Sequence, residues 1–170
     1  VFSDPLGEFS KIRAQLAKGY PEDVRRKKTA ARAIEMAQAG QYNYMRCIRH
    51  GEAGAARMAL HAFCEAALSM LYLLNRRYMP FYKWALRGAR ELPRLQGLAD
   101  SLETLLCSGG APSGAAANQA LIEQICACIA AELRAQGLSA EHCDYLEPHA
   151  FSVFSGITDQ KLRALDIFAG

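Results

Sequence analysis

The sequence predicts an all-α protein, an antiparallel helical bundle with short helices at its C-terminal end. Apolar residues recur at steps of three and four over long stretches, which is the period of an amphipathic helix. Sustained apolar-polar alternation and the Asn-Gly hairpin dipeptide are absent, and Val and Thr are few, so strands are not indicated. Short turns between successive helical patterns make an antiparallel bundle the economical arrangement.

The first half of the chain reads as three helices. A short helix is predicted from about Glu8 to Lys18, with Phe9, Ile12 and Leu16 on one face. Pro21 is typical of a first helical turn, and the helical pattern that follows runs to about His50 with a kink possible at Gly40. The most apolar stretch, from about Glu52 to Met79, should form the central helix.

Turn residues divide the second half. Pro80 ends the central helix and another helix begins near Phe81, while Pro93 separates it from an apolar stretch that holds Leu95 to Leu106. The segment from Ser108 to Gly114 reads as a flexible linker. A helix then runs to about Gln136, where Gly137 is a natural stop, and short helices follow to about Phe168.

Length and composition predict a single helical domain that covers residues 1–170. A chain of 170 residues with 51% hydrophobic residues suffices for one sizeable core. The chain starts at Val1 without a basic leader, so we expect it to be the C-terminal part of a longer protein. No apolar run approaches the roughly 20 residues of a membrane span. We therefore expect a soluble protein and no membrane partner.

Six cysteines are present, and several lie in apolar helical stretches where a small hydrophobic residue would fit. We interpret them as reduced thiols, which predicts a cytoplasmic location. Charge is unevenly distributed, because residues 95–170 hold nine acidic and three basic residues although the whole chain is net positive at +3. The basic N-terminal part would suit phosphates, an acidic partner or nucleic acid, although solvated charge explains most basic runs.

Recognisable catalytic and metal-binding motifs are absent. The sequence has no Gly-x-Ser-x-Gly elbow, and Gly109-Gly110 lacks the lysine of a phosphate loop. Cysteine, histidine and glutamate gather between Cys126 and His149, but their spacing matches no standard zinc site. We predict no catalytic residue and no metal ligand in this chain.

Two Arg-His pairs leave a second function open. Arg46 and His50, and likewise Arg57 and His61, are four residues apart and would share a helix face. The pairs invite comparison with the helical ribonuclease domains of bacterial toxin pairs, whose Arg and His are separated by four to six residues. Only three residues intervene here, so that motif is not met. A toxin-like ribonuclease or nucleic-acid-associated module using Arg57 and His61, and a plain protein-interaction domain, are the alternatives.

Aromatic residues mix with cations in two short segments. One runs from Leu73 to Trp84 around Pro80, and the other runs from Gln41 to Arg49. Such side chains can stack on a base and neutralise phosphates, or they can form a well-packed turn with solvated cations. At 1.5 Å per residue, antiparallel helices would separate the two segments by roughly 25 Å, so one can serve a site and the other a domain interface.

Four motifs in order carry a family resemblance: Val1-Phe-Ser-Asp-Pro-Leu-Gly-Glu-Phe-Ser10, Tyr20-Pro-Glu-Asp-Val24, Gln41-Tyr-Asn-Tyr-Met-Arg46 and Leu74-Asn-Arg-Arg-Tyr-Met-Pro-Phe-Tyr-Lys-Trp84. The chain resembles the bacterial domain of unknown function four-zero-three-seven, which typically follows a polymerase-beta-type nucleotidyltransferase domain. The resemblance is strong over most of the first hundred residues and weak beyond Leu106.

The resemblance implies a helical, substrate-side domain that packs against an N-terminal nucleotidyltransferase domain and is non-catalytic alone. The Gly-Ser and Asp-x-Asp motifs of that superfamily are absent, so magnesium and a nucleoside triphosphate are expected only with the catalytic domain. Partners would be that domain and a nucleotide or small-molecule substrate. Carried over position by position, the implied binding residues are Asn75, Tyr78, Tyr82, Lys83, Trp84, Tyr42, Asn43 and Arg46.

Overall fold

The protein is all-α, as the sequence predicts, and the computed structural model describes residues 3–108 and 112–170. No strand occurs among these residues. The elements in chain order are α1 (Glu8–Leu16), α2 (Glu22–Met36), the π-helical segment η1 (Ala37–Tyr44), α3 (Met45–Arg49), α4 (Ala53–Leu74), α5 (Tyr82–Ala89), α6 (Leu98–Cys107), the 3-10 turn η2 (Pro112–Gly114), α7 (Ala115–Ala135), α8 (Leu146–Ser155) and α9 (Gln160–Arg163). The predicted linker at 108–114 falls partly outside the described residues.

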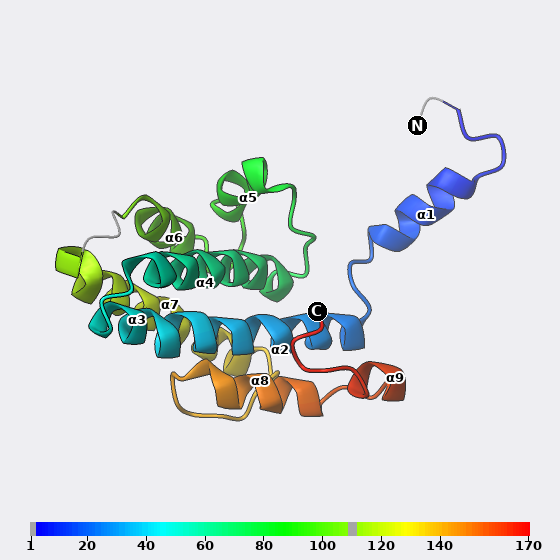
Figure 1. Ribbon diagram of the computed structural model, residues 1–170. Coiled ribbons are helices and arrows are strands. Elements are labelled where there is room, and N and C mark those ends of the chain that lie inside the picture. Colours follow the sequence, from blue (N-terminus) through cyan, green and yellow to red (C-terminus); the bar gives the residue numbers. More distant parts are fainter. Residues whose placement is uncertain (1–2, 109–111) are drawn as a thin grey trace.

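Helix α4 occupies the centre of the bundle. It packs against α2, η1 and α3 on one side and against α5 and α6 on the other, and α8 covers the far side of α2 (Figure 1). Its fully buried side chains include Phe63, Met70 and Leu71. By length and composition alone α4 could cross a membrane, which corrects the expectation that no apolar stretch approaches that length. However, 56% of its apolar window is buried inside the fold, as in the core helix of many globular proteins.

Helix α1 stands away from the bundle (Figure 1). The predicted apolar face is present, but none of the residues of this helix is buried. Phe9 is 69% exposed, Ile12 52% and Leu16 55%, and Leu6 just before the helix is 85% exposed. The amphipathic pattern therefore predicts the helix correctly, but the apolar face of the helix is not part of the core.

The long helix predicted over 22–50 is real, and its middle is π-helical. Gly40 lies at the closest approach of η1 to the core: a Cβ there would clash with the Phe63 ring and lie 2.9 Å from Ile122 Cγ2. The kink expected at Gly40 is thus a widened helical segment, and its glycine lets three helices meet.

Two buried basic residues of α2, Arg25 and Lys27, connect this helix to distant parts of the chain. Arg25, 2% exposed, donates to Glu22 at 2.7 and 3.1 Å and to Gln136 Oε1 at 3.3 Å. Gln136 Nε2 in turn donates to the Leu74 carbonyl at 2.8 Å, so the network joins α2 to the ends of α4 and α7. Lys27, 3% exposed, donates to the main-chain carbonyls of Asp166 and Ile167 and so holds the C-terminal segment along α2.

The Gly40 contact generates a stability prediction. Gly40→Ala should lower the free energy of unfolding by about 1–3 kcal/mol, because the added methyl overpacks the meeting point with Phe63 and Ile122. Gly54→Ala is the matched control: Gly54 also lies in a helix, and a Cβ there meets nothing within 4 Å. The control should be neutral or stabilising by up to about 1 kcal/mol. Urea unfolding of both variants measures the difference, and equal midpoints would contradict this account of the close approach.

Candidate functional site

The corner between α4 and α5 begins five residues earlier than expected. Helix α4 was predicted to reach Met79, but it ends at Leu74 with Asn75 as its C-cap. Arg76 has a positive φ of 55° and cannot continue a right-handed helix. The residues from Arg76 to Phe81 therefore form an irregular connection, and α5 starts at Tyr82.

Asn75 holds this corner together. Its amide nitrogen donates to the Leu71 carbonyl at 2.8 Å and to the Arg94 carbonyl at 3.0 Å, while its oxygen accepts from the Arg94 main-chain N–H at 3.0 Å. An amide in this position ties the end of α4 to the segment after α5. Its hydrogen bonds are made within the protein, which is the specific partner that a polar residue after an apolar run requires.

The aromatic residues of the corner are mostly exposed. Tyr78 packs edge-on against Tyr20 at a centroid distance of 4.4 Å, which joins the connection before α5 to the segment before α2. Trp84 is 55% exposed and lies beneath the Arg87 guanidinium at 5.4 Å, and Lys83 is exposed beside it. Among the described residues, neither Lys83 nor Arg87 forms an ion pair.

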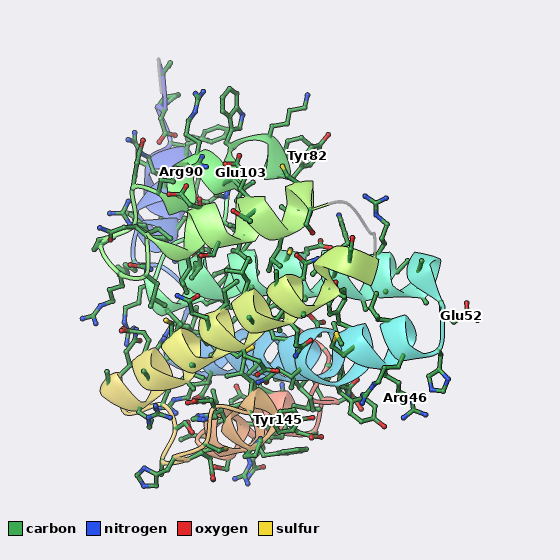
Figure 2. All side chains as sticks on the ribbon, turned by 90° about the vertical axis from the view of Figure 1, so that its left-hand side faces the viewer. Arg46, Glu52, Tyr82, Arg90, Glu103 and Tyr145 are labelled. Carbon is green, nitrogen blue, oxygen red and sulfur yellow. The ribbon has the colours of Figure 1, made fainter. Side chains whose placement is uncertain are left out.

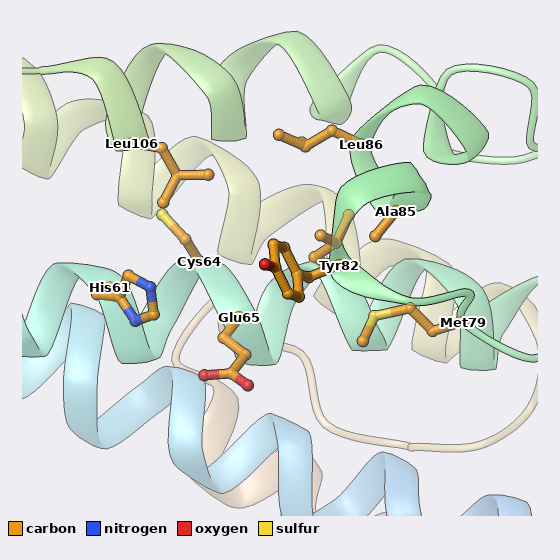
Figure 3. Close-up of a pocket in the computed structure, with 9 residues that line it drawn as sticks. His61, Cys64, Glu65, Met79, Tyr82, Ala85, Leu86 and Leu106 are labelled. Atoms are coloured by element: carbon orange, nitrogen blue, oxygen red, sulfur yellow. The ribbon is translucent and has the colours of Figure 1, made fainter.

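A cavity of about 430 Å³ opens between α4, α5 and α6 (Figure 3). Its lining comprises His61, Cys64, Glu65, Leu68, Met79, Tyr82, Ala85, Leu86 and Leu106. Burial raises the pKa of the Cys64 thiol to about 12, so this cysteine stays protonated near neutral pH and is no nucleophile. A mainly apolar cavity with a few polar groups at its edge is the usual form of a small-molecule site.

The Gln41–Arg46 cluster divides between structural and exposed roles. Gln41 donates to Glu123 at 2.8 Å and to the Asp144 carbonyl, and it accepts from the Leu146 N–H at 2.9 Å, so it anchors the start of α8. Tyr42 is 53% exposed, and its hydroxyl accepts from the exposed Arg46 at 2.6 Å. Asn43 lines a different cavity, between η1 and α4.

The predicted binding residues therefore do not converge on one place. Figure 2 shows Tyr82 and Arg46 on different sides of the molecule. Within the corner, Tyr82 lines the α4–α5–α6 cavity, Asn75 lines a separate cleft with Arg94 and Gln136, and Lys83 is among the lining residues of neither. The sequence did not separate the exposed residues of α5 from Asn75, whose hydrogen bonds are made within the fold.

Arg57 and His61, the pair of the ribonuclease alternative, share a face of α4 as their spacing predicts. Both line a cavity of about 320 Å³ with Leu105 and Ser108. No hydrogen bond joins them to each other in the part of the chain described. In residues 3–108 and 112–170 no group of three His, Cys, Asp or Glu side chains could hold a metal. His149 is fully buried and donates through Nε2 to the Cys143 carbonyl at 2.8 Å.

Sequence reasoning missed most of the cavity, because its lining comes from three helices that only the fold brings together. Leu68, Leu86 and Leu106 look like ordinary core residues in a helical pattern. The usable signal is the polar line that includes His61 and Glu65, four residues apart on the otherwise apolar α4. Two polar side chains on one face of a central helix indicate where that helix meets solvent.

Comparison with known families decides what the chain belongs to. Residues 1–85, half of the chain, match the domain of unknown function DUF4037. The chain belongs to the DUF4037 family. The matched part of this DUF4037 protein runs from α1 to the first turn of α5 and includes Lys83 and Trp84. No curated protein and no solved structure matches the chain significantly.

The structural role of Asn75 and the exposure of Trp84 predict different losses of unfolding free energy when each residue is replaced by alanine. Asn75→Ala should cost about 1–3 kcal/mol of unfolding free energy, because the Arg94 N–H and two carbonyls lose their partner. Trp84→Ala should cost less than about 1 kcal/mol, because over half of the ring already faces solvent. Chemical unfolding of the two variants gives the comparison. A loss of roughly 3 kcal/mol in Trp84→Ala would mean that the ring belongs to the core.

Proposed function

We propose that this domain is the substrate-side partner of a nucleotidyltransferase domain and does not catalyse the transfer by itself. The family resemblance suggests this partner, and the sequence lacks the Asp-x-Asp pair that would hold magnesium. The observation that carries the proposal is the exposed surface of α5, where aromatic rings lie beside cations that form no ion pair in residues 3–108 and 112–170. Magnesium and a nucleoside triphosphate would come with the catalytic domain.

The chemistry of the α5 face suits a nucleotide. Tyr82 is 69% exposed although its ring packs against Phe81 at 4.4 Å, and Trp84 is 55% exposed although Arg87 lies over its ring. A base could stack on the surface that each ring leaves open. Lys83 and Arg87 lie on the same short helix, and a phosphate would neutralise them. Since Arg87 already covers the Trp84 ring at 5.4 Å, one phosphate contact would fix the guanidinium and the indole together.

The connection between α1 and α2 supports a partner domain beside this face. The segment after α1 packs on the loop before α5, because Tyr20 contacts Tyr78 and the Gly19 backbone lies against the Arg76 carbonyl. Helix α1 thus leaves the bundle next to α5 with its apolar face uncovered. We propose that the nucleotidyltransferase domain covers Phe9, Ile12 and Leu16 and faces the exposed rings of α5.

Loss of the lysine tests the nucleotide contact. In the protein that carries both domains, Lys83→Ala should weaken the binding of magnesium ATP about three- to tenfold, because one charge-assisted phosphate contact is removed. Lys161→Ala is the matched control, since Lys161 is also exposed and forms no ion pair among the described residues. Calorimetric titration measures both. Unchanged affinity in Lys83→Ala would remove α5 from the nucleotide site.

A charge on the face of α1 tests the domain contact. Ile12→Asp should weaken binding between this chain and a separately produced nucleotidyltransferase domain of the same protein by more than tenfold, because an aspartate would be buried against an apolar surface. Its melting temperature should not change, since no residue of α1 is buried within the chain. Lys11→Asp, on the same helix but outside the apolar stripe, is the control. Equal binding by the two variants would rule out the proposed interface.

A further inference from the structure

The cavity between α4, α5 and α6 has an apolar interior and a polar edge. Leu68, Met79, Ala85, Leu86 and Leu106 supply the interior together with the protonated Cys64. Figure 3 shows His61 at one edge, Glu65 on the side that faces α2, and the Tyr82 ring across the opening between Cys64 and Met79. The volume of about 430 Å³ lies within the range of small-ligand sites.

The three polar residues at the edge have no polar partner among the described residues, although the Tyr82 ring packs against Phe81 at a centroid distance of 4.4 Å. In the described part of the chain, the side chains of His61, Glu65 and Tyr82 take part in no hydrogen bond and no ion pair, although other polar residues nearby do. Tyr72, also on α4, donates to the Ala85 carbonyl at 2.7 Å, and Arg32 pairs with Glu35 at 3.0 Å. The edge of the cavity therefore offers a carboxylate, an imidazole and a phenol that are free to bind something else.

The charge at the edge is negative on the Glu65 side. Arg32 pairs with Glu35, three residues further along α2, and does not pair with Glu65, which lines the same groove from α4. Glu35 and Glu65 line the same groove. Burial raises the pKa of Glu35, the nearby Glu65 charge adds to this effect, and Arg32 opposes it. Arg57 is two helical turns away from Glu65 and lines the neighbouring cavity beyond His61. A cation at the opening would meet an uncompensated carboxylate and the face of an aromatic ring.

We propose that this cavity binds a small organic amine, with its apolar or aromatic body between α4, α5 and α6 and its ammonium group at the edge between Glu65 and Tyr82. The carboxylate would accept charge-assisted hydrogen bonds, and the Tyr82 ring would add a cation–π contact. A carboxylate ligand of the same shape would be repelled by Glu65. The inference goes beyond the proposed function, because it assigns a ligand to a cavity that the nucleotide-binding face of α5 shares only at Tyr82.

Methionine NMR gives a direct test with a defined probe. The chain has five methionines, of which Met79 lines the cavity while Met36 and Met70 are fully buried in the core. In protein labelled at the methionine methyl groups, tryptamine should shift the Met79 signal in a saturable manner and leave Met36 and Met70 in place. Indole-3-propionate, which carries a carboxylate instead of the amine, should bind at least tenfold more weakly.

Variants separate this site from a nonspecific apolar surface. Glu65→Gln should weaken tryptamine binding about tenfold, because the charge-assisted contact is lost. Glu52→Gln, an exposed glutamate at the start of the same helix without a side-chain capping bond, should bind as the unchanged protein does. Both should keep nearly the original melting temperature, since neither side chain makes a hydrogen bond or an ion pair among the described residues.

Three outcomes would overturn the inference: no saturable Met79 shift, equal affinity for the amine and the acid, or equal affinity in Glu65→Gln. Magnesium ATP titrated into the two-domain protein, with and without Lys83→Ala, keeps the two proposals apart. If tryptamine binding fails while Lys83→Ala still weakens ATP binding in the two-domain protein, only the amine site is wrong. If tryptamine binding follows Glu65 while ATP binding ignores Lys83, only the nucleotide face is wrong.

Discussion

The arrangement of the whole domain depends on the close contact between Gly40 and the ring of Phe63. A side chain at position 40 would overlap that ring and approach Ile122, so the backbone of η1 reaches α4 and α7 only because glycine is present. In the same π-helical segment Tyr44 is buried, and its hydroxyl accepts a hydrogen bond from Asn118 at 3.0 Å. The segment also places Gln41 beside the start of α8. The close approach at Gly40 thereby lets η1 contact both Phe63 of α4 and Ile122 of α7.

The all-α class and most of the helices could be predicted from the sequence, because helical periodicity and turn residues are local signals. The errors arise where distant residues decide. Helix α4 stops at Leu74 since Asn75 binds Arg94 and Arg76 takes a left-handed conformation. The apolar face of α1 predicted a helix correctly, but periodicity does not say which surface covers that face. The sequence suggests that Arg25 and Lys27 are solvated. In the structure, Arg25 donates a hydrogen bond to Gln136, and Lys27 donates to the carbonyls of Asp166 and Ile167.

The candidate site was only partly predictable for the same reason. Residue type alone does not distinguish Asn75, whose bonds are made within the chain, from Lys83, whose charge has no partner among the described residues. The segment from Leu73 to Trp84 combines Asn75, whose hydrogen bonds hold the corner together, with the exposed residues at the start of α5. The Gln41–Arg46 motif shows the same mixture of structural and exposed residues. Gln41 binds the start of α8, while its neighbour Tyr42 faces solvent.

The short connection between α1 and α2 has a consequence for how strongly a partner needs to bind. Residues 17–21 span at most about 17 Å when extended, at roughly 3.5 Å per residue. A domain bound to α1 would therefore be confined to a small volume around α5, where its effective concentration would be in the range of millimolar or higher. Contacts across that gap can then be individually weak and still be occupied most of the time.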